Sequence, residues 1–212
     1  MSSSRERVLA RIRTALADVP LAASDPPVRR GYLPAHIPED RATLLTVLAE
    51  NLTDYRAVVH RSTAADLPGL IAHRLRAHGS RSVAVPADLP PGWLDALHDI
   101  QVVTDSAELT AGRLDAVDSV LTGCTLAVAE TGTVVLDAGP AQGRRVLTLV
   151  PDHHLCVVRA DQVVASLPRA LPLLDPTRPQ TWISGPSATS DIELDRVEGV
   201  HGPRGLEVVL VG

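Results

Sequence analysis

The sequence predicts an α/β protein with a doubly wound, largely parallel sheet, an antiparallel hairpin insert and an N-terminal helical arm. Three observations predict this fold class. Hydrophobic residues make up 45% of the 212 residues, which is enough for a continuous core. From residue 41 onward, short Val and Leu runs alternate with helical patterns, as in βαβ units. Between residues 126 and 158 the apolar runs follow one another closely, which favours a hairpin.

The N-terminal segment is predicted to be an arm separate from the domain. Over residues 4–17 the apolar residues recur at helical spacing, with Arg and Glu on the other face. Residues 18–38 then contain five prolines, which prevent regular structure. We therefore expect an arm over residues 1–38 and an α/β domain over residues 39–212. The apolar face of the arm packs either on its own domain or on a partner.

The domain is predicted to alternate helices and strands. Helical patterns cover residues 41–48 and 67–77, and a short helix is expected near 162–167. The expected strands are residues 57–59, 83–85, 101–104, 120–122, 126–128, 133–136, 146–150, 155–158, 182–184 and 206–211.

Composition excludes several classes of function. Aromatic residues make up only 2% of the chain and the net charge is -5, so nucleic acid is not an expected partner. All 20 basic residues are Arg. A Schiff-base lysine and a P-loop lysine are therefore impossible, and a phosphate or carboxylate must bind to Arg or to backbone N–H groups.

The two cysteines, Cys124 and Cys156, are too few to hold an iron–sulfur cluster, which ordinarily needs four protein ligands. Any cluster is therefore expected in a partner protein. The N-terminus has charges spread among its apolar residues, unlike a signal peptide, and no apolar run is long enough to span a bilayer. We expect a cytoplasmic protein with both cysteines reduced and buried.

Glu130, Thr131 and Gly132 lie between two apolar runs, so a carboxylate is expected at a strand end beside a glycine turn. Such a carboxylate can act as a base or a nucleophile. A solvated Glu130 in a β-turn, with Gly132 at positive φ, explains the same pattern.

His153 and His154 are adjacent where a strand begins. Neighbouring side chains of a strand point to opposite faces, so these imidazoles cannot easily share one metal ion. We expect no metal site, and one of the two can face a ligand.

The stretch ISGPSATSDIE, residues 183–193, leads from a strand into small hydroxyl residues. Ser190 and Glu193 have the spacing of a capping box, and free N–H groups at such a helix start can bind an anion at an edge of the sheet. Alternatively, Ser190 only caps its own helix, and His201 and Arg204 only close the turn into the last strand.

Four motifs carry a resemblance to a known family: AETGTVVL at 129–136, VPDHH at 150–154, ISGPSATSDIE at 183–193 and GVHGPRGLEVVLV at 199–211. In this order they resemble the LUD-domain family, in particular its lactate utilisation protein C type. The resemblance covers residues 120–212 and extends loosely to residue 41. It implies a fold related to the NagB/RpiA/CoA-transferase group and a cluster-free, accessory or substrate-handling role beside iron–sulfur proteins that oxidise L-lactate to pyruvate.

For a small hydroxy acid, the resemblance and the residue chemistry together indicate a site at one edge of the sheet. Glu130 or His201 would accept the hydroxyl proton, and backbone N–H groups near Ser187, with Arg204, would bind the carboxylate. The remaining candidate binding residues are Thr131, Gly132, His153, Gly185, Thr189, Ser190 and Asp191.

Two other functions stay open. Glu130-Thr131-Gly132 resembles the Glu-Asn-Gly turn of CoA transferases, whose Glu forms an acyl intermediate, although Thr131 stands where that turn has Asn. The chain could therefore be a stand-alone CoA-transferase-like enzyme acting on a small carboxylate. It could also be a ligand sensor without catalysis.

Overall fold

The computed structural model describes residues 3–18, 31–189, 197–198 and 202–212. The chain divides into two units, residues 1–33 and 34–212. The first contains α1 (Ser4–Ala15), whose start is fixed by a reciprocal capping box. The Ser3 backbone N–H donates to Glu6 Oε2 at 2.6 Å, and the Glu6 N–H donates to Ser3 Oγ at 3.2 Å.

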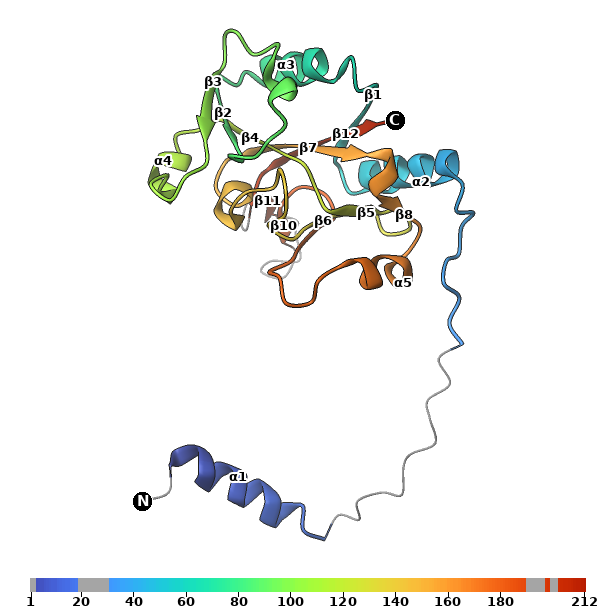
Figure 1. The fold of residues 1–212 in the computed structure, drawn as a ribbon, viewed down its shortest axis with the longest axis vertical. Coiled ribbons are helices and arrows are strands. Elements are labelled where there is room, and N and C mark those ends of the chain that lie inside the picture. Colours follow the sequence, from blue (N-terminus) through green and yellow to red (C-terminus); the bar gives the residue numbers. More distant parts are fainter. Residues whose placement is uncertain (1–2, 19–30, 190–196, 199–201) are drawn as a thin grey trace. The chain divides into compact units, whose positions relative to one another are not determined.

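A six-stranded sheet forms the centre of the second unit (Figure 1). Its strand pairs are all parallel, which confirms the largely parallel sheet expected from the sequence. The last strand of the chain lies inside the sheet, beside the first strand. The order across the sheet is β1 (Val58–Ser62), β12 (Gly205–Val211), β7 (His153–Arg159), β4 (Ser119–Thr122), β2 (Ser82–Val85) and β3 (Gln101–Thr104).

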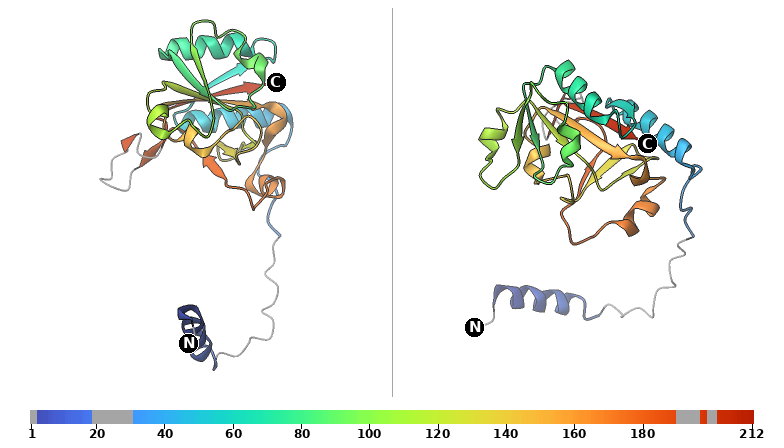
Figure 2. Two further views of the ribbon diagram at one scale, coloured as in Figure 1. Left: turned by 60° about the vertical axis from the view of Figure 1, so that its left-hand side comes forward. Right: turned by 45° about the horizontal axis from the view of Figure 1, so that its top comes forward.

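The two long helices of this unit cover opposite faces of the sheet (Figure 2). In α2 (Arg41–Asp54), Asp40 caps the first turn by accepting from the Thr43 N–H, and Leu44, Leu48 and Leu52 are buried at four-residue spacing. Leucine and isoleucine side chains of α3 (Leu67–His78) pack on the other face, and α3 ends at Gly79 in the left-handed conformation.

A second, four-stranded sheet lies on the α2 side of the first. Its order is β8 (Val163–Val164), β5 (Leu126–Val128), β6 (Thr133–Leu136) and β9 (Thr181–Ile183). The pair β5 and β6 is the expected antiparallel hairpin, which here belongs to a separate sheet. Short elements fill the connections: η1 (Pro91–Leu94), α4 (Ala111–Leu114), η2 (Arg145–Thr148), η3 (Ala160–Gln162), α5 (Leu167–Ala170), η4 (Leu171–Leu173), and the pair β10 (Ala188–Thr189) and β11 (Val197–Glu198).

Two expected elements were wrong. Residues 146–150 do not form a strand, because η2 occupies most of them. Leu147 of this helical turn is buried in one cluster with Val120 and Leu114, and a short apolar run does not distinguish a strand from a buried turn. The helix expected near 162–167 is replaced by β8, which pairs with β5, and α5 begins only at Leu167.

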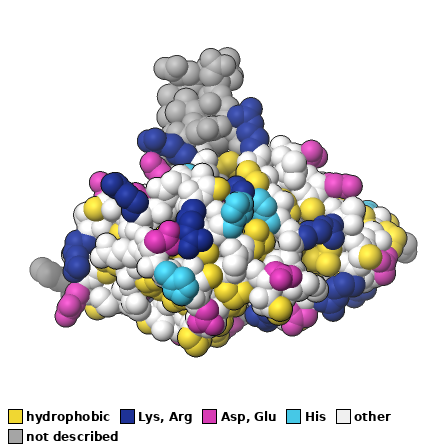
Figure 3. Space-filling view, turned by 90° about the horizontal axis from the view of Figure 1, so that it is seen from above, with side chains coloured by type: hydrophobic (Ala, Val, Ile, Leu, Met, Phe, Trp, Pro, Cys, Tyr) yellow, Lys and Arg dark blue, Asp and Glu magenta, His cyan; other side chains and the backbone are white. Residues whose placement is uncertain are grey.

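The described surface is mixed in charge. On the face shown in Figure 3, acidic, basic and histidine side chains are interspersed with small apolar areas. Among the described residues no helix is long and apolar enough to cross a membrane.

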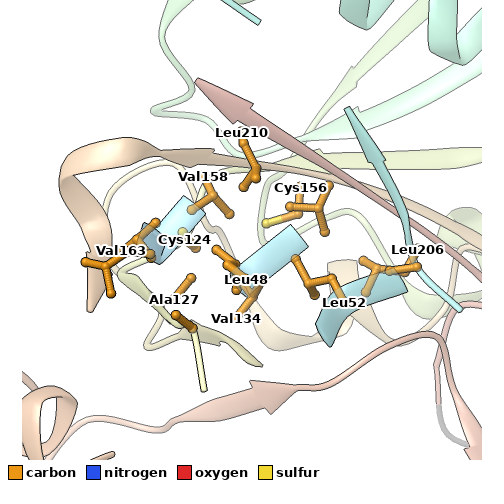
Figure 4. Packing of buried hydrophobic residues seen from close by; sticks show 14 of the residues in the cluster. Leu48, Leu52, Cys124, Ala127, Val134, Cys156, Val158, Val163, Leu206 and Leu210 are labelled. Atoms are coloured by element: carbon orange, nitrogen blue, oxygen red, sulfur yellow. The ribbon is translucent and has the colours of Figure 1, made fainter. Parts of the chain in front are cut away.

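The core between the two sheets is built from small and branched side chains (Figure 4). One face of β7 and β12 contributes Cys156, Val158, Leu206, Val208 and Leu210, and the second sheet contributes Ala127, Ala129, Val134 and Leu136. The leucines of α2 complete this cluster. The opposite face of the sheet packs on α3 through a second cluster that includes Leu155, Val157 and Val209.

A buried carboxylate interrupts the face that packs on α3. Glu207 of β12 is 6% exposed and accepts a hydrogen bond from Arg74 Nε at 2.7 Å. Its carboxylate also lies 2.7 Å from His60 Nε2 and 3.3 Å from His153 Nε2. Burial by itself would raise the pKa of Glu207, but the contacts with His153, Arg74 and His60 outweigh it and lower the pKa below the ordinary value of 4.5. Glu207 is therefore ionised in the folded protein and joins α3, β1 and β7.

Replacing Glu207 with Gln is expected to lower the free energy of unfolding at pH 7 by about 3 kcal/mol, because Arg74 would lose its buried partner. The folded pKa of Glu207 is depressed, so its stabilisation is complete above about pH 4.5 and is lost as the pH falls below that value. The acid-induced loss of stability should therefore be smaller in Glu207→Gln. Urea unfolding at pH 7 and pH 4 measures both effects.

Asp99→Asn is the matched control, since Asp99 also pairs with an arginine of α3 but is exposed to solvent. Exposed ion pairs contribute little, so this variant should unfold almost as the wild type does. Equal losses in the two variants would contradict the role assigned to Glu207.

Candidate functional site

A cavity of about 210 Å³ opens where the second sheet meets the first. His154 and Leu206, the second residues of β7 and β12, contribute to its lining. The remaining lining residues are Arg145 and Thr148 of η2, residues 181–187 of β9 and the turn after it, and Gly202 and Pro203. Because the lining residues His154 and Leu206 are near the start of their strands, the cavity is at the amino ends of the central strands.

Arg145 is the cationic side chain of this cavity. Its Nη1 donates to Thr148 Oγ1 at 3.2 Å, and no carboxylate of the described residues forms an ion pair with it. Desolvation lowers the pKa of Arg145, which nevertheless remains charged because an arginine pKa is far above neutral. A guanidinium at a cavity mouth without an acidic partner is suited to bind a carboxylate.

His154 is the buried imidazole of the cavity. It is 1% exposed, and its Nε2 lies 2.8 Å from Thr122 Oγ1 of the neighbouring strand. His153 points to the other face, where its Nδ1 lies 2.8 Å from Ser119 Oγ and its ring stacks on His78 with 3.9 Å between centroids. The adjacent histidines therefore have separate surroundings, and within the described residues no group of His, Cys, Asp and Glu could hold a metal ion.

Two glycine turns pack closely against the end of α2, and one of them, at Gly185, also lines the cavity. Gly185 has φ of +86°, and a β-carbon there would lie 2.4 Å from the Tyr55 carbonyl oxygen. Gly132 has φ of +56°, and its β-carbon would lie 2.8 Å from the Asn51 carbonyl carbon. The two turns can contact the end of α2 only because they lack a side chain.

A row of hydroxyl groups joins the hairpin turn to the cavity. Thr131 Oγ1 lies 2.8 Å from Thr133 Oγ1, which lies 2.7 Å from Ser184 Oγ. Ser184 and Ser187 line the cavity, and the Ser187 N–H donates to the Pro203 carbonyl at 2.8 Å. Thr131 is thus connected to the cavity through two hydroxyl groups.

Glu130 is outside the cavity lining and holds the segment that precedes α2. Its Oε1 accepts from the His36 N–H at 2.5 Å, and its Oε2 lies 3.3 Å from His36 Nδ1. Nearby, Ser166 Oγ donates to the Pro34 carbonyl. Both carboxylate oxygens of Glu130 therefore contact the chain itself.

The other candidate residues lie elsewhere or are not described. Arg204 is exposed, with its Nη1 3.7 Å from Asp152 Oδ2, and it does not line the cavity. Thr189 is in β10. Ser190, Asp191 and His201 lie outside the described residues, as does the expected capping box at Ser190.

The domain that holds this cavity matches a known protein family. The family model of the LUD domain matches residues 45–211. This chain belongs to the LUD-domain family.

Several known proteins are similar to this LUD domain over most of its length. Lactate utilization protein C from Deinococcus radiodurans is 46% identical over 91% of this chain and 90% of its own length. Lactate utilization protein C from Geobacillus thermodenitrificans is 28% identical over 79% and 78%. A crystal structure of a DUF162 family protein from Deinococcus radiodurans has a TM-score of 0.71 and 42% identity, and the match covers 82% of this chain and all of that chain.

Sequence reasoning missed the cationic residue of this LUD domain's cavity. Arg145 is one of 20 arginines and belongs to no recognised motif. The absence of lysine limited the carboxylate partner to Arg or a backbone N–H, but which arginine lacks an acidic partner depends on the folded structure.

Gly185→Ala is expected to lower the free energy of unfolding by about 2 kcal/mol or more, because alanine is strained at this φ and its methyl group meets the α2 backbone. Gly69→Ala is the control. Gly69 lies in α3, and a β-carbon added there would have no atom within 4 Å, so alanine should cause no loss. Chemical denaturation measures both variants, and a Gly185→Ala protein as stable as the wild type would contradict the close packing on α2.

Proposed function

We propose that this LUD domain is the cluster-free component of a system that oxidises L-lactate to pyruvate with iron–sulfur partner proteins, and that the cavity at Arg145 binds the hydroxy acid. Relatives named lactate utilization protein C support a role in lactate utilisation. The substrate, the partners and the site are our proposal.

The guanidinium of Arg145, which has no acidic partner among the described residues, is the observation that carries this proposal. A small hydroxy acid needs a cation for its carboxylate and polar groups for its hydroxyl. The cavity offers Arg145 for the carboxylate, and Thr148, Ser184 and His154 for the hydroxyl. Its volume of about 210 Å³ suits a small acid with a few water molecules.

Oxidation of L-lactate to pyruvate removes two electrons and two protons, so the reaction requires an electron acceptor. Two cysteines cannot provide the usual four ligands of an iron–sulfur cluster. The proposal therefore assigns electron transfer to the partner proteins, and orientation of the acid to this chain. A cytoplasmic location is consistent with this division of labour.

The geometry favours this function over a CoA-transferase-like reaction through Glu130. A nucleophilic carboxylate must reach an acyl group, whereas both oxygens of Glu130 contact His36. A ligand sensor would use the same cavity without turnover, so activity of the reconstituted system distinguishes it from the substrate-handling function.

Arg145→Gln is expected to weaken binding of L-lactate or pyruvate to the isolated protein by about tenfold or more, because a charge-assisted hydrogen bond contributes about 1.5–3 kcal/mol. Calorimetric titration measures the dissociation constant directly. In the reconstituted system the same variant should raise the KM for lactate.

Arg113→Gln is the matched control, because Arg113 is an exposed arginine of α4 that does not line the cavity. It makes the same change in net charge and should bind the acid as the wild type does. Glu130→Gln tests the competing role of that carboxylate in the same assay: abolished lactate-dependent activity without a large fall in melting temperature would assign the chemistry to Glu130. Unchanged affinity in Arg145→Gln would refute the proposed site.

The partner surface is proposed on α1. Val8, Ile12 and Leu16 recur every four residues and so form one apolar face, while residues 34–212 have their own core. A variant lacking residues 1–33 should keep a cooperative thermal transition within a few degrees of the wild type and co-purify less with the iron–sulfur proteins.

Ala10→Ser, on a different face of α1, provides a control with the helix retained. If the truncated protein fails to fold, α1 is part of its own core. If it folds and retains full co-purification, the partner does not bind α1.

A further inference from the structure

Both cysteines lie together in the core between the two sheets, separate from the acid-binding cavity. Cys156 is on β7 and pairs in register with Thr122, the last residue of β4, so Cys124 follows just beyond that pair. Cys124 Sγ lies 3.8 Å from Gln162 Oε1, Cys156 Sγ lies 3.7 Å from the Gly123 carbonyl oxygen, and the two thiols are close enough for each to shift the pKa of the other. Figure 4 shows both residues in the same packed cluster.

The two thiols differ in their access to solvent. Cys156 is 0% exposed, whereas Cys124 is 4% exposed and lines a second cavity, of about 350 Å³. Trp93, Gln162 and Arg159 are among its other lining residues. A small molecule in this cavity therefore meets Cys124, and Cys156 lies behind it.

This second cavity has a definite place in the topology. It lies at the carboxyl ends of β2 and β4, which are neighbours in the sheet. From β2 the chain continues outward to β3, and after β4 the next strand of this sheet is β7 on the other side. The connections leave in opposite directions at this point, which opens a crevice in parallel sheets.

The surroundings favour a thiolate. The neighbouring Cys124 lowers the pKa of Cys156 despite desolvation and, together with His154 and Thr122, brings it to about 5. The same interaction raises the pKa of Cys124. Cys156 is therefore the thiol of the pair that ionises first, and transfer of the Cys124 proton to it gives Cys124 thiolate character. A buried thiol in purely apolar surroundings would stay protonated and inert.

We infer that Cys124 and Cys156 form an oxidisable pair, which a hydroperoxide entering the second cavity converts to an intramolecular disulfide. The Cys124 thiolate attacks the peroxide, forming an S–O bond as the O–O bond breaks, and the departing oxygen takes up a proton. The Cys156 thiolate then attacks this sulfenic sulfur, forming the S–S bond as hydroxide leaves and is protonated to water. With hydrogen peroxide, two thiols and one peroxide yield one disulfide and two water molecules.

The test treats the native full-length protein with hydrogen peroxide and follows mass and free thiols. The wild type should lose both thiols together and the mass of two hydrogen atoms, and dithiothreitol should restore both. Cys156→Ser should instead give a sulfenic acid on Cys124, trapped by dimedone, and form it about tenfold more slowly because the shared thiolate is lost. Cys124→Ser should keep Cys156 reduced, because that thiol is enclosed.

The inference is overturned if both thiols persist in the native wild type and react only after unfolding. It is also overturned if oxidation adds oxygen irreversibly without a disulfide, or if Cys156→Ser reacts as fast as the wild type. Thermal melting of the serine variants, with alanine variants in reserve, ensures that only folded proteins are compared. The wild-type mass change does not depend on any variant and separates this inference from the proposed acid site.

Discussion

The structure depends on covering the face of the parallel sheet that Leu206, Val208 and Leu210 present toward the second sheet. A parallel sheet is buried on both faces, and this chain has almost no aromatic side chains with which to fill a wide gap. A second sheet and α2 approach closely instead, through Ala127, Ala129 and the leucines of α2. The close contacts of Gly132 and Gly185 with α2 follow from this approach.

The arginines show how the same residue type supports structure or function. Arg74 is directed at Glu207, which is buried and needs a cation, so this pair joins α3 to the sheet and has no capacity for a ligand. Arg145 has a hydroxyl partner and lines a cavity. In a chain whose basic residues are all arginine, the acidic partners of each guanidinium distinguish a structural residue from a candidate for ligand binding.

The core also brings polar groups from both ends of the sheet into contact. His154 lines the cavity at the amino ends of the strands and is hydrogen-bonded to Thr122, which contacts Cys156. Cys156 shares a core cluster with Cys124, which lines the cavity at the carboxyl ends. A change in charge on Cys156 therefore lies one residue, Thr122, from the imidazole of the cavity at the amino ends.

The sequence by itself determined the α/β class, most strands, the hairpin and the family, because these are encoded in local periodicity and in contiguous motifs such as AETGTVVL. Residues 146–150 were misassigned because a short apolar run fits both a strand and a buried turn. Only the tertiary structure decided that β12 lies between β1 and β7, that Arg145 has no acidic partner among the described residues and that Cys124 and Cys156 lie in one core cluster. These features join residues far apart in the chain, and their partners are selected by packing, which leaves no pattern in the local sequence.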